Sequence, residues 1–530
     1  MTILTAYSPI DGHLLGEYVI SSADEIKASV VRARCAGQTW QQLSVTERCQ
    51  HLAALTPLLL AKLDSICDVL CQTTGKVKTE ALLAEVYPSL DLLAYYGKHA
   101  PKVLQERAVF TSPLSFPAST AQIEFHPYGV VAILAPWNFP FQLAFIPMIT
   151  ALIAGNAVIL KASELSLPIS ALLLELFQQL ALPAHLVQTL VGDGSVGEQL
   201  IDAAPDLVFF TGGLHTGRAV MQRAAQHPIP VLLELGSKDA MVVFADAQLS
   251  RASHAVMYGA FSHSGQICIS IERLYVEQHC FDDFLQQLLH KLTTLTIGHG
   301  EYGDLGTITS TRQFALVEAH YNDALAKGAC ASGPLERNGN YVKPVILWKM
   351  RADMRIMQEE TFGPIVAVLP FINEADVIAQ LNASEFGLHA SVWSQDIAKA
   401  ARVAKQLVVG GWVINDVIKN AGHPQLPFGG VKKSGFGRYH GAEGLRAFSY
   451  SVSTMINRSQ LAKEPNWFPY SQTQYQNFKG YLDVIYGSGS WLQRVQRNKL
   501  ELTHFREFSQ FNFLQHWQNL KSRLPWHRIF

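Results

Sequence analysis

Short apolar runs and amphipathic segments alternate through the first half of the chain. A buried parallel strand is apolar along its whole length, whereas a helix with one covered face repeats its apolar positions every three or four residues. These patterns predict helices between consecutive strands, with strands at 130–136, 157–163, 186–191, 207–211 and 230–235 and helices at 140–154, 167–180, 195–203 and 214–226. Such alternation is typical of a doubly wound α/β sheet with parallel strands.

A second α/β region follows, with strands expected at 273–277, 364–371, 389–394 and 410–416. Before residue 115 the pattern is mostly helical. Two extended segments, near 120–128 and 446–457, lie outside both sheets, and we expect them to pair with each other. The predicted architecture is α/β: a doubly wound parallel-sheet domain from 1–113 and 129–236, a second α/β domain at 237–445, a small β arm from 114–128 and 446–460, and a C-terminal extension at 461–530.

One segment has the length and the low charge of a membrane span, FQLAFIPMITALIAGNAVIL at residues 141–160. Pro147 and the Gly155-Asn156 pair interrupt it, and the β-rich AVILKAS at its end is typical of a buried strand. We therefore expect a helix, a turn and a strand within an α/β core.

Composition narrows the class of protein. A chain of 530 residues exceeds one hydrophobic core, so two or three domains are expected. A net charge of −1 lacks the positive field that binds phosphate backbones, so nucleic acid is not an expected partner. The seven cysteines are an odd number without metal-ligand spacing, and the N-terminus lacks a secretory pattern. We expect no metal site and a reducing, cytoplasmic location.

Four polar groups stand at predicted strand ends or turns. Cys268 lies in HSGQICIS, Asn138 in PWNFP after a strand, Glu234 in LELGSK at the end of another, and Glu360 in the turn EETFGP. A lone cysteine is more often a buried hydrophobe than a nucleophile. Its companions favour reactivity here, because groups at strand ends of an open α/β sheet converge on a ligand.

Two glycine-rich stretches are candidates for binding a diphosphate at a helix start. GDGSVG, with Gly194 and Gly197, has the G-x-G-x-x-G pattern but lacks the acidic partner expected for a ribose contact. FTGGLHTG at 210–217 leaves a strand and opens a helix, so it is the better placed candidate.

From about residue 7 to 457 the chain resembles the aldehyde dehydrogenase superfamily. The motifs that carry the resemblance occur in the family's order: APWNFP, AGNAVILKASE, FTGGLHTG, LELGSK, GQICIS, EETFGP and PFGGVKKSGFGRYHG. The 34-residue separation of Glu234 and Cys268 is also that of the family. YHG at 439–441 and WFPYS at 467–471 are similar to the branch that handles aromatic and long-chain aliphatic aldehydes.

The resemblance implies oxidation of an aldehyde to a carboxylic acid. Cys268 would attack the aldehyde to give a thiohemiacetal, whose oxyanion the Asn138 amide and the Cys268 backbone N–H would hold. Hydride would then pass to NAD(P), and Glu234 would be the general base that hydrolyses the resulting thioester.

For the cofactor, the resemblance implies NAD, with NADP as the alternative. Lys161 and Glu164 would contact the adenosine ribose, Gly212 and Gly213 the diphosphate, and Glu360 and Phe362 the nicotinamide half. The full set of expected cofactor-binding residues is Trp137, Lys161, Ser163, Glu164, Gly194, Gly197, Phe210, Thr211, Gly212, Gly213, Gly217, Leu235, Gly236, Glu360 and Phe362.

Three positions depart from the family pattern. Gly213 stands where many members carry Ser, Ser237 replaces the commoner Gly, and Ser264 replaces a frequent Asn. No catalytic group is lost, so these departures bear on cofactor affinity.

Alternatives remain on both function and assembly. One is a CoA-acylating or semialdehyde-specific enzyme, and another is a non-catalytic binding or structural protein of the same fold. The resemblance also implies a homo-oligomer, a dimer or tetramer, with residues 1–113 and 129–236 as the NAD(P)-binding domain, 237–445 as the catalytic domain and the β arm used for oligomerisation.

Residues beyond 460 lie outside the shared pattern. Residues 491–530 include seven Lys or Arg and two Glu, with aromatic residues interleaved. Apolar residues recur at every third position from 502 to 520, and because each step turns about 300° around a helix, one straight helix would not present a single apolar face. We expect two short helices packed on the body or on a partner subunit, with peripheral membrane contact as the alternative.

Overall fold

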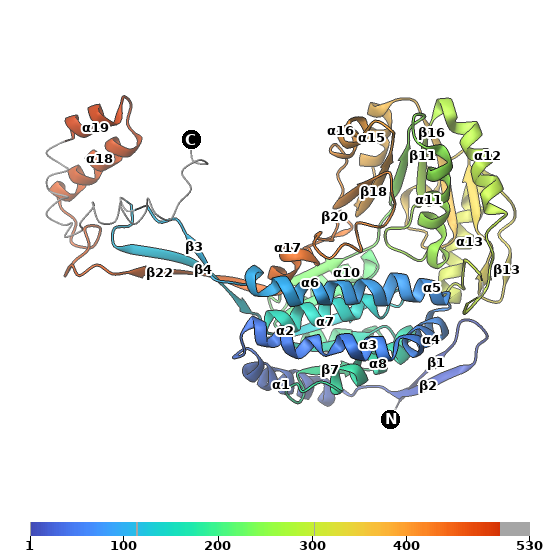
Figure 1. The fold of residues 1–530 in the computed structure, drawn as a ribbon, viewed down its shortest axis with the longest axis horizontal. Coiled ribbons are helices and arrows are strands. Elements are labelled where there is room, and N and C mark those ends of the chain that lie inside the picture. Colours follow the sequence, from blue (N-terminus) through green and yellow to red (C-terminus); the bar gives the residue numbers. More distant parts are fainter. Residues whose placement is uncertain (1, 113–114, 302, 499–530) are drawn as a thin grey trace. The chain divides into compact units, whose positions relative to one another are not determined.

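The computed structural model describes residues 2–112, 115–301 and 303–498, and the chain divides into two compact units (Figure 1). Unit 1 comprises residues 1–105 and 125–450, and unit 2 comprises residues 106–124 and 451–530. Unit 1 contains two large, mainly parallel sheets. The α/β fold class predicted from the sequence is therefore confirmed.

A six-stranded sheet carries the first half of the site. Its strand order is β21-β9-β8-β5-β6-β7, and only β21 is antiparallel to its neighbour. Because the chain places β6 and β8 on opposite sides of β5, the winding reverses at β5, where ligands bind beyond the carboxyl ends of strands. The strands are β5 (Val130–Ala135), β6 (Ala157–Ala162), β7 (Val187–Leu190), β8 (Leu207–Thr211), β9 (Val231–Glu234) and β21 (Gly435–Phe436).

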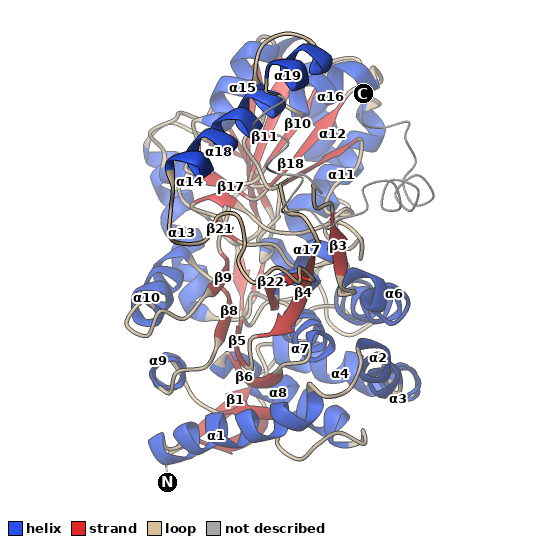
Figure 2. Ribbon diagram, turned by 90° about the vertical axis from the view of Figure 1, so that its left-hand side faces the viewer, coloured by secondary structure: helices blue, strands red, loops and turns tan. Residues whose placement is uncertain are grey.

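Helices cover both faces of this sheet (Figure 2). One face packs against α7 (Gln142–Ala154) and α8 (Leu167–Gln178), and the other against α1 (Ala23–Trp40) and α9 (Gly194–Asp202), beside α10 (Leu214–Ala224).

Every residue of α7 after Gln142 is buried, because α2, α6 and α17 form a second layer over it. A helix that is apolar on all sides is expected in such a position. The segment 141–160 is thus a helix, a turn and a strand, as predicted, and none of the described helices is long and apolar enough to cross a membrane.

The outer layer comes from the N-terminal part of the chain, which is mainly helical, as expected. A hairpin precedes it that the hydrophobic pattern did not predict, β1 (Ile3–Tyr7) paired antiparallel with β2 (Leu14–Val19). The helices are α2 (Val45–Ala53), α3 (Leu55–Ala61), α4 (Leu63–Thr74), α5 (Lys78–Ala81), a π-helical turn (Leu82–Val86) and α6 (Tyr87–Val103).

A seven-stranded sheet forms the second half of unit 1. Its order is β12-β15-β16-β11-β10-β18-β19, and all pairs except β12 with β15 are parallel. The strands are β10 (Ala240–Val243), β11 (Arg273–Glu277), β12 (Cys330–Ala331), β15 (Val345–Trp348), β16 (Ile365–Phe371), β18 (His389–Trp393) and β19 (Gly411–Ile414). The sequence did not predict β10 or β15, since a four-residue apolar run does not distinguish a strand from a buried helix.

The two faces of this sheet belong to two hydrophobic cores. Ala240 and Val242 of β10 enter one core, while Met241 and Val243 enter the other, which is the alternation that a strand imposes. The first core contains α13 (Thr311–Ala326), α14 (Arg355–Gln358), α15 (Glu374–Asn382) and α16 (Ile397–Ala404), and the second contains α11 (Leu249–Phe261) and α12 (Phe281–Leu292). Short pairs β13 (Arg337–Asn338) with β14 (Tyr341–Val342) and β17 (Phe386–Gly387) with β20 (Val431–Lys432) complete unit 1, together with α17 (Gly441–Ala447).

Unit 2 is built on a three-stranded sheet of order β22-β4-β3. The two extended segments expected to pair do so, as β4 (Ser119–Pro127) and β22 (Ser449–Asn457), with β3 (Arg107–Val109) added to β4. Extended structure at 446 was wrong, because residues 446–447 end α17. Beyond the sheet lie α18 (Gln472–Tyr486) and α19 (Trp491–Arg497), both started by Ser capping boxes. The helices expected over 499–530 fall outside the described residues.

One glycine closes the edge of the six-stranded sheet. Gly435 of β21 pairs with Glu234 at φ +112°, and a Cβ there would lie 2.0 Å from the Leu233 carbonyl oxygen. We predict that Gly435→Ala lowers the melting temperature, since alanine at such a φ costs more than about 1 kcal/mol. Gly97→Ala is the matched control: Gly97 is an exposed position of α6 with nothing within 4 Å of its Cβ, so the melting temperature should rise. Equal behaviour of the two variants in thermal unfolding would contradict the prediction.

Candidate active site

The loops of the two sheets meet around one cavity. The carboxyl ends of β5, β8 and β9 contribute one wall, and the loops that precede β11, β16 and β18 contribute the other. The cavity has a volume of about 770 Å³, including space that is open to solvent. Eleven residues expected from the sequence line it: Trp137, Asn138, Thr211, Gly212, Gly213, Glu234, Leu235, Gly236, Cys268, Glu360 and Phe362.

Cys268 is free and partly exposed at this cavity. The loop before it turns through three left-handed residues, His263 (φ 50°), Ser264 (φ 53°) and Gly265 (φ 73°). A Cβ on Gly265 would lie 2.2 Å from the Gly363 carbonyl oxygen, so only glycine lets this loop pack on the EETFGP loop. Asn tolerates left-handed backbone better than Ser, which explains physically why Asn is the frequent residue at position 264.

The Gln266 side chain ties the same loop to the segment that contains Thr307 and Thr309. Its amide donates to the Thr307 carbonyl oxygen at 3.2 Å, and its Oε1 accepts from the Thr309 N–H at 2.9 Å. The Gln266 main-chain oxygen in turn accepts a hydrogen bond of 3.0 Å from Nδ2 of the buried Asn138. The amide predicted to bind the oxyanion is therefore tied directly to the cysteine loop, and its second N–H remains for a ligand.

The two predicted glutamates occupy different surroundings. Glu234 is buried, and its Oε2 has no hydrogen-bond partner. Glu360 accepts from the Ser237 N–H at 2.8 Å, and its carboxylate lies where a Cβ on Gly236 would be, 2.3 Å from Oε2. An unpaired buried carboxylate is costly, so the position of Glu234 is not explained by a gain in stability.

A buried ion pair supports the Glu360 loop. Lys238 donates to Glu272, and Glu272 accepts from the backbone N–H groups of Thr361 and Phe362 at 2.9 Å. This arrangement fixes Phe362 with φ 53°, and its ring meets the Trp137 ring edge-on at 5.6 Å.

The low-dielectric surroundings change the ionisation of the site. Burial raises the pKa of the Cys268 thiol, and the carboxyl groups of Asp239, Glu360 and Glu234 raise it further. Burial also raises the pKa of Glu234 well above its usual value and that of Glu360 to about 8. In the free enzyme at neutral pH the Cys268 thiol and the Glu360 carboxyl group therefore keep their protons.

The end of β8 fits a dinucleotide diphosphate. Gly213 is the N-cap of α10 without a side-chain cap, so the first N–H groups of that helix are free to bind an anion. The Thr211 hydroxyl is buried without a partner, and a Cβ on Gly212 would lie 2.5 Å from the Phe210 ring. Glycine at 212 thus lets the backbone approach a ligand closely.

The remaining predicted residues do not line the cavity. Lys161 ends β6 with its Nζ 3.9 Å from Glu164, and Ser163 caps the short turn that contains Glu164. Gly194 and Gly197 begin α9, and a Cβ on Gly197 would contact Lys161 at 4.0 Å. These five residues are neighbours beyond the ends of β6 and β7. Phe210 and Gly217 are packing positions, with a Cβ on Gly217 only 2.3 Å from Leu235.

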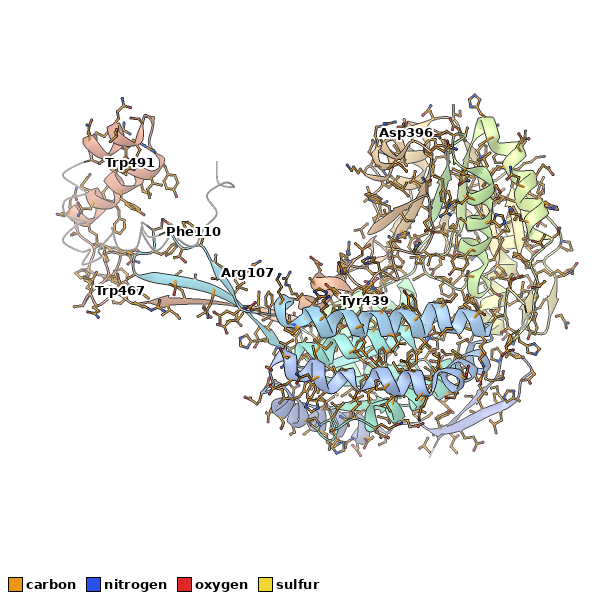
Figure 3. The ribbon with its side chains drawn as sticks, in the orientation of Figure 1. Arg107, Phe110, Asp396, Tyr439, Trp467 and Trp491 are labelled. Carbon is orange, nitrogen blue, oxygen red and sulfur yellow. The ribbon has the colours of Figure 1, made fainter. Side chains whose placement is uncertain are left out.

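Seven lining residues were not predicted: Pro136, Leu143, Gln313, Leu316, Leu388, Phe428 and Tyr439. Phe428 and Tyr439 lie within the motif PFGGVKKSGFGRYHG and pack edge-on at 5.4 Å, so the motif held a signal for both; Tyr439 is labelled in Figure 3. The sequence held no such signal for the leucines or for Gln313. Among the described residues, no cluster of three or more His, Cys, Asp or Glu could hold a metal ion.

A free thiol, an amide donor and a buried carboxylate beside a dinucleotide-sized cradle define a nucleotide-dependent oxidoreductase. The family model described as the Aldehyde dehydrogenase family matches residues 2–454, and the chain belongs to this family. It is an NAD(P)-dependent enzyme that oxidises an aldehyde to a carboxylic acid through a cysteine thiohemiacetal and thioester. The enzymatic interpretation is confirmed over the non-catalytic one.

Several relatives are similar over most of the chain. The 4,4'-diapolycopene aldehyde oxidase of a Methylomonas species is 60% identical over 528 residues, 100% of both chains. The betaine aldehyde dehydrogenase of Bacillus subtilis (strain 168) is 33% identical over 84% of this chain and 91% of its own.

Solved structures agree. An NAD-dependent aldehyde dehydrogenase from Sinorhizobium meliloti matches with a TM-score of 0.83 and 30% identity, covering 88% of this chain and 93% of that one. Betaine aldehyde dehydrogenase from Staphylococcus aureus, in complex with NAD⁺, matches with a TM-score of 0.82 and 28% identity, covering 88% and 94%.

The raised pKa of the thiol has a direct readout. Because only the thiolate is alkylated, we predict that Cys268 of the free enzyme reacts slowly with iodoacetamide at pH 7 and faster at every higher pH up to 10. Above pH 8, where Glu360 ionises, Glu360→Gln should react faster than the native enzyme, since one charge that raises the thiol pKa is gone. Peptide mass spectrometry measures the rate, with exposed Cys35 as internal reference. A rate already at its plateau at pH 7 would overturn the prediction.

Proposed function

We propose that this enzyme oxidises the terminal aldehyde of a long, apolar polyene of the diapolycopene type, with NAD as hydride acceptor. The observation that carries the proposal is the relative named 4,4'-diapolycopene aldehyde oxidase, which is 60% identical over the full length of both chains. The walls of the cavity support it, because Leu143, Leu316, Leu388 and Phe428 offer apolar surface to such a chain.

Cys268 begins the reaction. The thiol first loses its proton to water. The thiolate Sγ then forms a bond to the aldehyde carbon while the C=O π bond breaks, and the carbonyl oxygen becomes an oxyanion that accepts hydrogen bonds from Asn138 Nδ2 and the Cys268 N–H. Donors aimed at such an oxygen stabilise the transition state by ~3 kcal/mol each. NAD, when bound, accepts the hydride that leaves the tetrahedral carbon, and a thioester on Cys268 remains.

Glu234 completes the turnover. Its unpartnered Oε2 faces the cavity, so it can bind a water molecule and take the proton that this water loses on attacking the thioester. Burial raises the pKa of Glu234, which suits this role because a carboxylate with a raised pKa is a stronger base than an exposed one. The C–S bond then breaks, the carboxylic acid leaves, and Glu234 returns its proton to the departing thiolate to restore the thiol.

The remaining residues bind and orient NAD. Thr211, Gly212 and Gly213 hold the diphosphate at the start of α10. Glu360, Phe362 and Trp137 border the nicotinamide half, and Lys161 with Glu164 binds the adenosine ribose, where a carboxylate disfavours the extra phosphate of NADP. Residues 1–113 and 129–236 then act as the NAD-binding domain and residues 237–445 as the catalytic domain.

The function is tested by following reduced NAD during incubation with a polyene dialdehyde in detergent micelles, and with hexanal as a short control. We predict a kcat/KM for the polyene at least tenfold above that for hexanal, because each buried methylene adds binding energy. Cys268→Ala should abolish turnover and keep NAD binding. Glu234→Gln should release one reduced NAD per site and then stall. Preference for hexanal, or turnover that requires CoA, would contradict the proposal.

We further propose that unit 2 contacts a membrane surface and that its three-stranded sheet joins subunits of a homo-oligomer. Unit 2 exposes large aromatic side chains, including Phe468 (77%), Tyr470 (69%) and Trp491 (60%); Figure 3 labels Trp467 and Trp491 among them. Residues 461–530 contain nine Lys or Arg and four Asp or Glu. Aromatic rings with basic residues favour an anionic lipid interface.

The C-terminal extension, residues 461–530, also agrees with the proposed polyene substrate. The family model ends at residue 454, whereas the diapolycopene-related protein matches the whole chain. A polyene aldehyde resides in lipid, so an enzyme that reaches it benefits from surface attachment. With seven free cysteines in the described structure, the cytoplasmic side of a membrane is the location we propose.

Vesicle sedimentation tests the membrane contact. The full-length protein should pellet with vesicles of phosphatidylcholine and phosphatidylglycerol, and less so at high salt because screening weakens the attraction. The triple variant Trp467→Ser, Phe468→Ser, Trp491→Ser should stay in solution. The control Tyr7→Ser, Tyr87→Ser, Ile372→Ser removes equally exposed apolar groups from unit 1 and should still pellet. If the first variant pellets normally, or changes oligomeric state in ultracentrifugation instead, the surface is not a membrane contact.

A further inference from the structure

A buried ion pair, Lys76 with Glu85, lies behind the wall of the cavity. Lys76 and Glu85 have side chains that are 0% exposed, and Lys76 Nζ lies 2.5 Å from Glu85 Oε1. Neither residue lines the cavity. Removing two charges from water costs several kcal/mol per ion unless further hydrogen bonds satisfy them, so the remaining contacts of this pair indicate what it does.

All of those contacts fall on the segment that carries Asn138. Lys76 Nζ donates to the Asn138 carbonyl oxygen at 2.9 Å and lies 4.0 Å from the centre of the Phe139 ring. Glu85 Oε2 accepts from the backbone N–H groups of Phe141 at 2.7 Å and Gln142 at 3.2 Å. The pair therefore clamps the connection between β5 and α7 from Asn138 onward.

The local backbone is shaped to place both charges. Glu85 belongs to the π-helical turn Leu82–Val86, and such single turns re-aim side chains and occur often at functional sites. Lys76 follows Gly75, which ends α4 at φ +75° and where a Cβ would lie 1.7 Å from the Thr307 hydroxyl.

The hydrogen bonds close into a ring. Lys76 holds the Asn138 carbonyl, the Asn138 amide holds the Gln266 carbonyl, and the Gln266 amide holds the Thr307 carbonyl. The Thr307 N–H then donates to the Gly75 carbonyl at 3.0 Å, which returns to the residue before Lys76. Asn138 and Gln266, the two partners in the Asn138 side-chain hydrogen bond, are thus both linked to the short loop that contains Gly75 and Lys76.

We infer that Lys76 and Glu85 are positioning residues that aim the free N–H of the Asn138 amide at the oxyanion formed on Cys268. The inference rests on the proposed role of Asn138. With its main chain held by Lys76 and one amide hydrogen held by Gln266, the other amide hydrogen has one direction, into the cavity. A donor fixed before the reaction stabilises the oxyanion without reorganising.

A purely structural pair would predict a different result. Its loss would lower stability and leave the rate of hydride transfer in the folded enzyme unchanged. A positioning pair predicts slower hydride transfer together with loss of the benefit from Asn138. The coupling between the pair and Asn138 therefore separates the two roles.

The test is a double-mutant cycle in single turnovers, with enzyme in excess over hexanal and saturating NAD. The first variant is Lys76→Met, Glu85→Leu, which removes both charges together so that neither is left buried without its partner. We expect hydride transfer to slow at least tenfold, with unchanged Kd for NAD. Asn138→Ala should cost roughly 10²–10³-fold in the native background and less than threefold in the variant.

The control is the other buried pair, changed in the same way as Lys238→Met, Glu272→Leu. That pair holds the loop of Glu360 and Phe362, so we expect a weaker Kd for NAD while Asn138→Ala keeps its full effect. Should the first variant fail to fold, Glu85→Gln replaces it, since the isostere keeps the shape and loosens Lys76. It should show the same loss of coupling with a smaller slowing.

The outcomes are distinguishable. If Asn138→Ala leaves hydride transfer unchanged in the native background, the proposed role of Asn138 fails. If Asn138→Ala slows it but the Lys76 and Glu85 variants do not, or if the effects multiply as independent changes, the positioning inference fails.

Discussion

One hydrogen bond joins the chemistry of the two sheets, from the Asn138 amide to the Gln266 carbonyl oxygen at 3.0 Å. Asn138 leaves the carboxyl end of β5 in the first sheet, and Gln266 belongs to the loop that leads through Cys268 into β11 of the second. The two sheets have separate hydrophobic cores. Ile267 and Ile269, on either side of Cys268, pack in the core of the first sheet. The geometry of the reacting groups therefore depends on this packing together with the polar contacts between loops.

Those loops are held by groups that are expensive to bury. Lys76 with Glu85 supports the Asn138 segment, and Lys238 with Glu272 supports the Glu360 segment. Each carboxylate also accepts two backbone N–H groups. Apolar side chains would fill the same space, but they would leave those N–H groups unpaired and would not fix the direction of the backbone. The cost of burying these charged pairs is thus offset because they fix the conformation of loops that have no regular secondary structure.

Much of this could be predicted from sequence, for particular reasons. Strands β5 to β9 fell within two residues of their expected ends, because buried parallel strands are apolar throughout and helices separate them. Cys268, Glu234 and Asn138 stood out since reactive or amide groups at strand ends are unusual. Lys76 and Glu85 did not, because Lys76 reaches Asn138 across 62 residues of chain and Glu85 reaches Phe141 across 56. In the sequence, Leu316 and Leu388 do not differ from leucines of a hydrophobic core, so the shape of the cavity could not be predicted from the sequence.

The burial that organises the site also sets its resting state. Desolvation and three neighbouring carboxyl groups raise the pKa of Cys268, so the free enzyme holds a neutral thiol. The same low dielectric strengthens the electrostatic interactions of any charged group that enters the site. A positively charged ring bordered by Phe362 would favour the thiolate, whereas a neutral aldehyde alone would not. A bound cofactor with such a ring would therefore make the cysteine more reactive through electrostatics. Gly236 and Gly265 keep Glu360 and the cysteine loop within contact distance of their neighbours.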